Sequence, residues 1–277
     1  MSGPGARERL RAYGQHEDAD IPLATAALDL AQWSEPHLNL APYHRHLQLL
    51  SSDVRAYIGA DEGDSALAIE AARQILARRY GYCYLDDAVV QVNQVRTIDR
   101  RCGGAETLAI LYAHVLSEHV HNLELLAFST RILLGIPVGG ERLLIDPLSD
   151  GRPVSARHMR QMLSSAKDGP QDLTLLDLKP LSSRQILLRL QDGVKTHQLR
   201  HAAPEAATQA LEASILLAPN EPRLWRELGV LYARQDQLLD AARALERFLT
   251  LPGNDAQRYT ASQLLQELTH RINKGDL

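Results

Sequence analysis

The stretch RRCGGAETLAILY, residues 100–112, decides the fold of this chain. Its glycine pair, Gly103–Gly104, stands directly before a segment whose apolar residues recur at helical spacing: Leu108, Leu111, Tyr112 and Val115. Residues three and four positions apart lie on one face of a helix, so these side chains form a stripe that faces a protein core. The sequence therefore predicts a buried helix that begins at the glycine pair.

Two segments rich in aliphatic residues follow this helix. They are LELLAFSTRILLGI (123–136) and ERLLIDPL (141–148), and the residues PVGG (137–140) separate them. Glycine adopts left-handed backbone conformations at no steric cost, as a tight connection between strands requires. We expect two adjacent antiparallel strands here.

Helices are predicted on both sides of these strands. Apolar residues at helical spacing indicate helices over residues 22–33 and 41–59, and Asp64 is placed to cap a third helix that ends near Arg79. A further helix is expected around residues 155–165. Aromatic residues make up only 5% of the chain, which favours helical packing over a sandwich of strands. We predict a mostly helical α+β fold in which helices cover a small antiparallel sheet.

From Ser182 onward the pattern is helical only, and it contains a repeat. An offset of 34 residues, the period of tetratricopeptide repeats, brings identical residues together. The matched residues are Ala207, Ala210, Leu211, Glu212, Leu217 and Asn220 with Ala241, Ala244, Leu245, Glu246, Leu251 and Asn254. Gly229 and Ala241 are small enough to let two helices approach closely, as dense core packing requires. The tail is therefore expected to be all-α and of the tetratricopeptide type.

These patterns divide the chain into three parts. We expect a flexible N-terminus over residues 1–19, a mixed domain over residues 20–180 and the helical tail over residues 181–277. One interpretation of the tail is a groove that binds a peptide. The other is that its helical hairpins and a last helix, residues 256–273, only extend and cap the first domain, since fewer than three repeats rarely fold alone.

Charge and composition narrow the classes of function. The 277 residues carry a formal charge of -4, so the overall electrostatics do not attract nucleic acid. No apolar run approaches the ~18 residues of a membrane helix, and no stretch has the form of a signal peptide. Cys83 and Cys102 lack the spacing of a zinc site or a disulfide framework. We expect a cytoplasmic protein that has no metal or other cofactor and binds neither nucleic acid nor membranes.

Three stretches resemble a known superfamily: RRCGGAETLAILY (100–112), LLAFSTRILLGI (125–136) and LLIDPLSDGRPVS (143–155). A helix that opens on a glycine pair, followed by strands and an Asp-Pro, is similar to the transglutaminase-like superfamily. The repeat in the tail makes the chain resemble the bacterial SirB branch more closely, and the resemblance spans roughly residues 20–275. It implies a transglutaminase-like domain followed by tetratricopeptide repeats, with a regulatory role.

The resemblance also assigns three catalytic positions. In active members of the superfamily, a cysteine at the first turn of the central helix is activated by a histidine and an aspartate on the next strands. Here these positions fall on Ala105, Arg131 and Asp146, so only the aspartate keeps its type. Alanine offers no nucleophile, and an arginine with a pKa above ~12 cannot act as a base. We therefore expect a non-catalytic member of the superfamily.

Cys102 is the alternative nucleophile. It lies just before the predicted helix and beside Arg100 and Arg101, where the helix dipole and positive charge lower a thiol pKa. A cysteine hydrolase or acyl transferase would then need a base from outside the strands, for example His158. We favour an ordinary structural thiol, because residues 122–157 contain no histidine.

Binding of a protein or peptide partner is accordingly the expected function. Trp225 and Tyr232 are the candidate contact residues in the tail, and self-association through an uncovered repeat end is a further hypothesis. A second candidate is an anion-binding patch of four arginines: Arg96, Arg100, Arg101 and Arg131. The alternative for this patch is a solvated surface whose arginines pair with Asp99 and Glu106.

Overall fold

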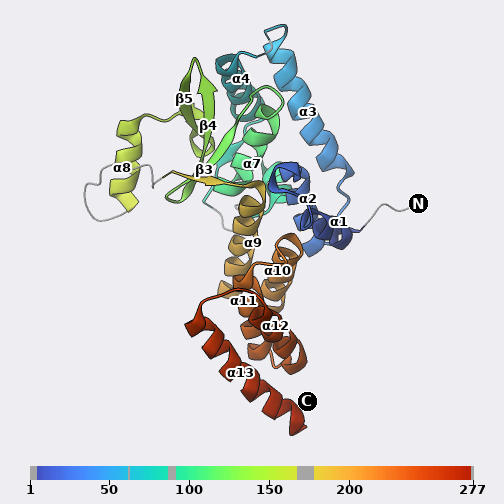
Figure 1. Cartoon of the computed structure of the whole chain (residues 1–277). Coiled ribbons are helices and arrows are strands. Elements are labelled where there is room, and N and C mark those ends of the chain that lie inside the picture. The colour runs from blue at the N-terminus through green and yellow to red at the C-terminus, as the bar shows by residue number, and fades with distance from the viewer. Residues whose placement is uncertain (1–4, 62, 87–91, 167–177, 276–277) are drawn as a thin grey trace. The chain divides into compact units, whose positions relative to one another are not determined.

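The computed structural model describes residues 5–61, 63–86, 92–166 and 178–275 (Figure 1), and we call these the described residues. Their contacts divide the chain into two compact units. The α+β unit comprises Asp18–Leu190, and the tail unit comprises Gln191–Leu277 together with the chain before Asp18. Among the described residues of both units, none of the helices is long and apolar enough to cross a membrane.

Helices dominate the α+β unit, as predicted. Its longer helices are α2 (Leu23–Ser34), α3 (Ala41–Ile58), α4 (Ser65–Ala72), α6 (Gln94–Arg100), α7 (Ala105–Leu116), α8 (Ala156–Ala166) and α9 (Ser183–Arg200), which continues into the tail unit. Single 3-10 turns are η1 (Asp18–Asp20) and η3 (Pro147–Ser149), and the π-helix η2 (Arg73–Arg79) prolongs α4. The helices expected from residue 22, from residue 41 and after Asp64 are confirmed. Asp64 caps α4, because its carboxylate accepts from the amides of Ala66 (2.8 Å) and Leu67 (3.2 Å).

The first predicted strand is a hairpin, so the prediction of one continuous strand over residues 123–136 was wrong. The segment forms β3 (Glu124–Phe128) and β4 (Arg131–Val138), which pair antiparallel with Phe128 opposite Arg131. Ser129 begins the turn between them with a φ of 53°. Few residues other than glycine, asparagine and aspartate adopt this left-handed conformation, so nothing in the residue types marks a turn here.

In the described residues the main sheet has five antiparallel strands in the order β6-β5-β4-β3-β7. β5 (Glu141–Asp146) pairs with β4, which confirms the predicted antiparallel pair, and Gly139 and Gly140 between them both have positive φ. The edge strands β6 (Arg152–Pro153) and β7 (Lys179–Leu181) each contain a proline. Proline lacks an amide hydrogen, so it suits an edge better than the centre of a sheet.

Helices cover both faces of this sheet. Residues 132–136 of β4 are all buried although neighbours on a strand point to opposite faces. On one face Met159 of α8 packs with Leu126, Phe128 and Leu133. α4 and α7 also contact β4, and Figure 1 shows them across the sheet from α8. A separate parallel pair, β1 (Cys83–Tyr84) and β2 (Cys102–Gly103), leads into α7.

The tail unit is all-α, in agreement with the sequence. Its helices are α1 (Ala6–Tyr13), α10 (Pro204–Leu217), α11 (Pro222–Arg234), α12 (Leu238–Thr250) and α13 (Asp255–Asn273), together with the end of α9. A flexible N-terminus was expected over residues 1–19, and the structure instead has a helix over Ala6–Tyr13, while residues 1–4 lie outside the described residues. This helix, α1, packs on α10 with Leu10 fully buried, and a Cβ on Gly14 would lie 2.1 Å from the carbonyl oxygen of Leu216.

α11 and α12 pack closely through the small residues of the repeat, Gly229 and Ala241. A Cβ on Gly229 would lie 2.7 Å from Cγ of Leu245 and 3.4 Å from the carbonyl oxygen of Ala241, so only glycine permits this approach. Leu245 and Phe248 are buried in the cluster that joins α12 to α13. The packing role predicted for Gly229 and Ala241 is therefore confirmed.

Candidate functional site

The position assigned to the nucleophile is the first residue of α7. Ala105 follows the N-cap residue Gly104, whose amide donates to Oγ1 of Thr107 (3.1 Å). A Cβ on Gly103 would lie 2.5 Å from that oxygen and 2.8 Å from Cγ2 of Thr97. Two fully buried threonines thus hold the backbone at the start of the helix, where Ala105 presents a methyl group at the position that the resemblance assigns to the nucleophile.

The positions assigned to the histidine and the aspartate lie together. The Arg131 guanidinium donates to Oδ2 of Asp146, a side chain with no exposed surface. Oδ2 also accepts from Oγ of Ser149 (2.9 Å), and Oδ1 accepts from the amide of Leu148 (2.9 Å). The carboxylate therefore has three donors, which offset the cost of burying its charge. The turn η3 that follows it packs against α7.

Cys102, the alternative nucleophile, lies beside the other cysteine. β1 and β2 pair with Cys83 directly opposite Cys102, and the two Sγ atoms are 3.2 Å apart. Both are free thiols, Cys83 exposed and Cys102 half-buried. Partial burial and the hydrogen bond to Cys102 raise the pKa of Cys83 to about 11. No histidine of the described residues bonds to either sulfur, so a thiol–imidazole pair is not formed among them.

His158, the candidate base for Cys102, lies on α8. There it lines a hollow of about 530 Å³ between α8 and the β3–β4 hairpin, with Phe128, Ser129, Thr130, Arg131, Gln161 and Met162. His158 therefore lies in the same hollow as Arg131. The side chain in contact with the Cys102 sulfur is Cys83.

The four arginines of the predicted anion patch bind several different partners. Arg96 pairs with Glu35 (3.0 Å) and Arg131 with Asp146, so both guanidinium groups are neutralised. Arg100 also has an interaction partner. The Arg96–Glu35 pair fits a solvated surface, whereas the Arg131 pair contains a fully buried carboxylate.

The carboxylates expected to pair with these arginines bind other groups. Asp99 accepts from the hydroxyl of Tyr43 (3.2 Å), and Glu106 pairs with Arg189 (3.2 Å). The arginine pairs expected for Asp99 and Glu106 are therefore not those that the structure shows.

Arg101 has an aromatic environment. Its guanidinium donates to Nε2 of His46 and to the hydroxyl of Tyr82 (2.6 Å), and it lies over the rings of Tyr80 and Tyr82. Burial and the charge of Arg101 lower the pKa of His46 to about 4, and burial raises the pKa of Tyr82 to about 12. Both rings are therefore neutral near pH 7, and neutral His46 can accept from the guanidinium.

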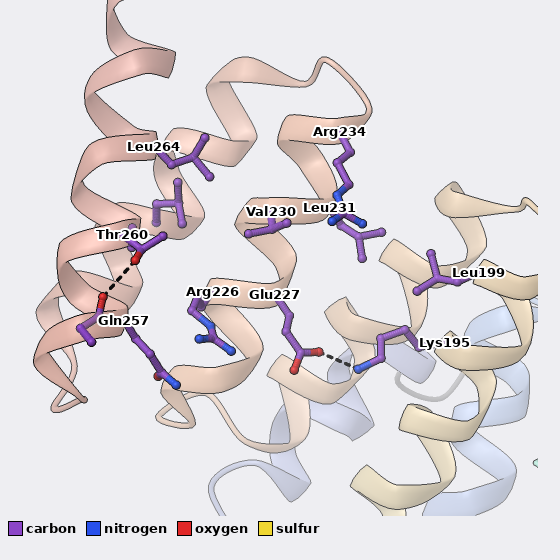
Figure 2. Close-up of a pocket in the computed structure, with 13 residues that line it drawn as sticks. Lys195, Leu199, Arg226, Glu227, Val230, Leu231, Arg234, Gln257, Thr260 and Leu264 are labelled. Carbon is purple, nitrogen blue, oxygen red and sulfur yellow. Dashed lines mark hydrogen bonds and ion pairs between the residues drawn. The ribbon is translucent and has the colours of Figure 1, made fainter.

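The tail unit contains a second candidate site, an apolar groove of about 510 Å³. Residues of α9, α11 and α13 line it (Figure 2), and Leu245 of α12 lines it as well. The apolar lining residues are Leu199, Val230, Leu231, Leu245, Ala256, Ala261 and Leu264, and the polar ones are Lys195, Arg226, Glu227, Arg234, Gln257 and Thr260. We call it the tail groove.

The tail groove has more positive than negative side chains: Lys195, Arg226 and Arg234 line it with the one carboxylate of Glu227. Glu227 bonds to Lys195 (2.6 Å) and to Arg223 (3.1 Å), so its carboxylate is neutralised, and Figure 2 shows the first of these contacts. Arg226 and Arg234 have no ion pair or hydrogen bond among the described residues. Val230 lies between them on α11 in Figure 2. The groove is therefore apolar in its middle, with an unpaired guanidinium toward each end.

Trp225 and Tyr232, the predicted contact residues, have structural partners instead. Both pack against the buried cluster that joins α12 to α13. Nε1 of Trp225 donates to the carbonyl of Pro219 (2.8 Å), and the hydroxyl of Tyr232 donates to Glu212 (2.6 Å). Neither lines the groove.

The groove residues were missed although a sequence signal for them exists. Arg226, Val230 and Arg234 recur every four residues, which places them on one face of α11. This face of α11 forms a groove only together with α9 and α13, which are distant in the sequence.

Comparisons with known proteins agree with this division of the chain. A profile of the transglutaminase-like superfamily matches residues 41–192, and a tetratricopeptide-repeat profile matches residues 196–266. Two Xylella fastidiosa proteins, from strains Temecula1 and 9a5c and each called UPF0162 protein, are 26% identical to this chain over 243 residues, 85% of each chain. The crystal structure of menin, described as revealing the binding site for the Mixed Lineage Leukemia protein, covers 98% of this chain and 76% of its own, at 11% identity and a TM-score of 0.39.

Proposed function

Since the chain belongs to the transglutaminase-like superfamily, we propose that it is a non-catalytic member of the SirB type, which binds a partner protein through its tail groove. Its expected setting is the bacterial cytoplasm and its expected role is regulatory. Ala105 and Arg131 support the non-catalytic part of the proposal. A methyl group cannot attack a carbonyl, and a guanidinium cannot take a proton at neutral pH.

The two unpaired arginines of the tail groove carry the binding part of the proposal. Arg226 is half-buried and Arg234 is exposed. A carboxylate that reaches a guanidinium without a counterion stabilises it, and Arg–carboxylate bonds are among the stronger hydrogen bonds of proteins. Val230 between Arg226 and Arg234 and the other apolar lining residues favour an apolar side chain at the centre of the ligand. We therefore expect a segment with acidic residues on both sides of apolar ones.

The spacing of the arginines sets the length of that segment. Arg226 and Arg234 are eight positions apart on α11, which corresponds to ~12 Å along the helix axis. In an extended peptide, residues four positions apart are separated by ~13 Å. An extended segment with acidic residues at its first and fifth positions therefore matches both guanidinium groups.

A labelled peptide tests this proposal. Its first and fifth residues are glutamate and the three between are leucine or valine, and fluorescence anisotropy measures its affinity for the full chain. Replacing either glutamate by glutamine should weaken binding about tenfold, because a charge-assisted hydrogen bond contributes about 1.5–3 kcal/mol. Equal affinity of the acidic peptide and its double-glutamine analogue would overturn the proposed ligand chemistry.

Variants of the chain provide the reciprocal control. R226Q and R234Q should each reduce affinity for the acidic peptide and leave the weak affinity for the neutral peptide unchanged. R243Q is the matched control, because Arg243 is an exposed α12 arginine that pairs with Asp240 (3.5 Å) and does not line the groove. Concentration-dependent light scattering without peptide binding would instead identify a second copy of the chain as the occupant.

Alkylation of Cys102 tests the non-catalytic part separately. An ordinary thiol reacts slowly with iodoacetamide at neutral pH, whereas an activated cysteine reacts rapidly because most of it is thiolate. We expect labelling of Cys102 no faster than that of a model thiol. Rapid labelling that is lost in H158Q would favour the cysteine hydrolase or acyl transferase.

A further inference from the structure

We propose that Cys83 and Cys102 are a modification site, at which a peroxide-class oxidant forms a reversible disulfide next to the start of α7. The proposal is independent of the tail groove. It rests on the pairing of β1 with β2, which places the two cysteines opposite each other with their Sγ atoms 3.2 Å apart.

The spacing between two paired strands suits a disulfide between opposite residues. Neighbouring strands lie ~4.8 Å apart, and disulfides join residues whose Cα atoms are ~4.4–6.8 Å apart. An S–S bond of ~2.05 Å requires the sulfur atoms to approach by roughly 1 Å more, which small rotations of the two side chains can supply. The bond can therefore form without separation of β1 from β2.

Both thiols are accessible, and the environment of Cys83 suits it to the second step of the reaction. Cys83 is exposed and Cys102 is half-buried, so a small oxidant reaches both from solvent. Burial and the neighbouring Cys102 raise the pKa of Cys83 to about 11, which keeps Cys83 protonated near pH 7. We assign Cys102 as the sulfur that is oxidised first and Cys83 as the thiol that resolves it.

The reaction balances with one peroxide per disulfide. The Cys102 sulfur attacks one oxygen of hydrogen peroxide, the O–O bond breaks, and a sulfenic acid and water result. The Cys83 sulfur then attacks the sulfenic sulfur, the S–O bond breaks, and the second water leaves with the Cys83 proton. Two thiols lose two electrons in total, and the peroxide gains them. The adjacent positions make the second step intramolecular, so it needs no unusually reactive thiol.

The bond would tie α6 into a closed loop. Residues 83–102 contain α6 and lead directly to Gly103–Gly104 before α7. Closing a loop of this length restricts the unfolded chain, and we expect Tm to rise by roughly 5 °C on oxidation.

Intact-mass measurement of the full chain tests the proposal. The reduced protein is exposed to hydrogen peroxide at a few molar equivalents, and the products are separated without reductant. We expect a monomer that has lost two hydrogen atoms, a proteolytic fragment pair joined through Cys83 and Cys102, and full reversal by a dithiol reductant. Oxidation that instead adds one or two oxygen atoms to the wild-type monomer would overturn it.

Single serine variants supply the control. C83S and C102S preserve the size of each side chain, and neither can form the internal bond. C83S should accumulate oxygen adducts or disulfide-linked dimers at peroxide concentrations that convert the wild type to the internal disulfide. If the wild type forms dimers as readily as C83S does, the two sulfurs do not react with each other and the proposal fails.

Discussion

Arg131 and Asp146 form an ion pair in which the carboxylate has no exposed surface and the guanidinium is 30% exposed. The arginine is the first residue of β4, directly after the Ser129 turn, and the aspartate is the last residue of β5. The same two positions are those that the sequence assigned to a catalytic histidine and its orienting aspartate. In this structure the guanidinium at the first position neutralises the buried carboxylate at the second.

R131A should destabilise the α+β unit strongly. The substitution leaves the Asp146 carboxylate buried with two neutral donors, and breaking a fully buried pair costs about 3–5 kcal/mol. Because Arg131 is partly exposed and water can enter, we expect a loss of about 2–3 kcal/mol in the free energy of unfolding, measured by urea denaturation.

R142A is the matched control for R131A on the same sheet. Arg142 pairs with Glu124 (2.6 Å), but both side chains are about half exposed, at 44% and 46%. Exposed pairs contribute up to about 1 kcal/mol, so R142A should change the unfolding free energy by less than that. Equal losses in the two variants would show that burial of Asp146 does not set the cost.

Acidification should weaken the fold through His46. Burial and Arg101 lower the pKa of His46 to about 4, whereas an unfolded histidine titrates near ~6.5. Between these values the unfolded chain binds a proton that the folded chain does not, so stability contributed by neutral His46 is present above pH ~6.5 and is lost as the pH falls toward 4. With allowance for partial exposure, we expect a loss of about 1–2 kcal/mol.

H46Q isolates this contribution. Glutamine keeps an oxygen that accepts from Arg101 and does not titrate, so the slope of stability against pH between 6.5 and 4 should be shallower in H46Q than in the wild type. Urea unfolding at several pH values measures both slopes. Parallel curves would mean that His46 titrates normally in the folded chain.

The features predicted correctly are those that a few neighbouring residues in the sequence specify. The cap at Asp64 and the apolar stripe of α7 each depend on a few consecutive residues. The superfamily and the repeat were also inferred from motifs of this kind, and the profile matches over residues 41–192 and 196–266 confirm both.

The features that were missed depend on contacts between distant segments or on an unmarked turn. The Ser129 turn lacks the glycine or asparagine that usually marks a left-handed position. Cys83 and Cys102 are nineteen positions apart and meet only because β1 pairs with β2. The contact role expected for Trp225 came from its place in the tetratricopeptide pattern, and its packing partners come from α12 and α13.

G14A tests whether α1 belongs to the tail unit in solution. A Cβ on Gly14 would lie 2.1 Å from a backbone oxygen of Leu216, which cannot move without distorting α10. We expect α1 to detach, to expose Leu10 at a cost of about 2 kcal/mol, and to exchange its amide hydrogens much faster. G5A at the other end of α1 meets no atom within 4 Å and should leave exchange unchanged.

G229A should destabilise the tail unit although alanine favours helices. The new Cβ would lie 2.7 Å from Cγ of Leu245, and overpacking of a dense core costs about 1–3 kcal/mol. Alanine recovers up to about 1 kcal/mol of helix propensity, so we expect a net loss of about 1–2 kcal/mol in urea unfolding. Gly253 is the matched control in the same unit, because a Cβ there meets its nearest atom, on Phe248, at 3.8 Å. If G229A is as stable as G253A, Leu245 moves aside at little cost, and the close approach of α11 and α12 does not require glycine.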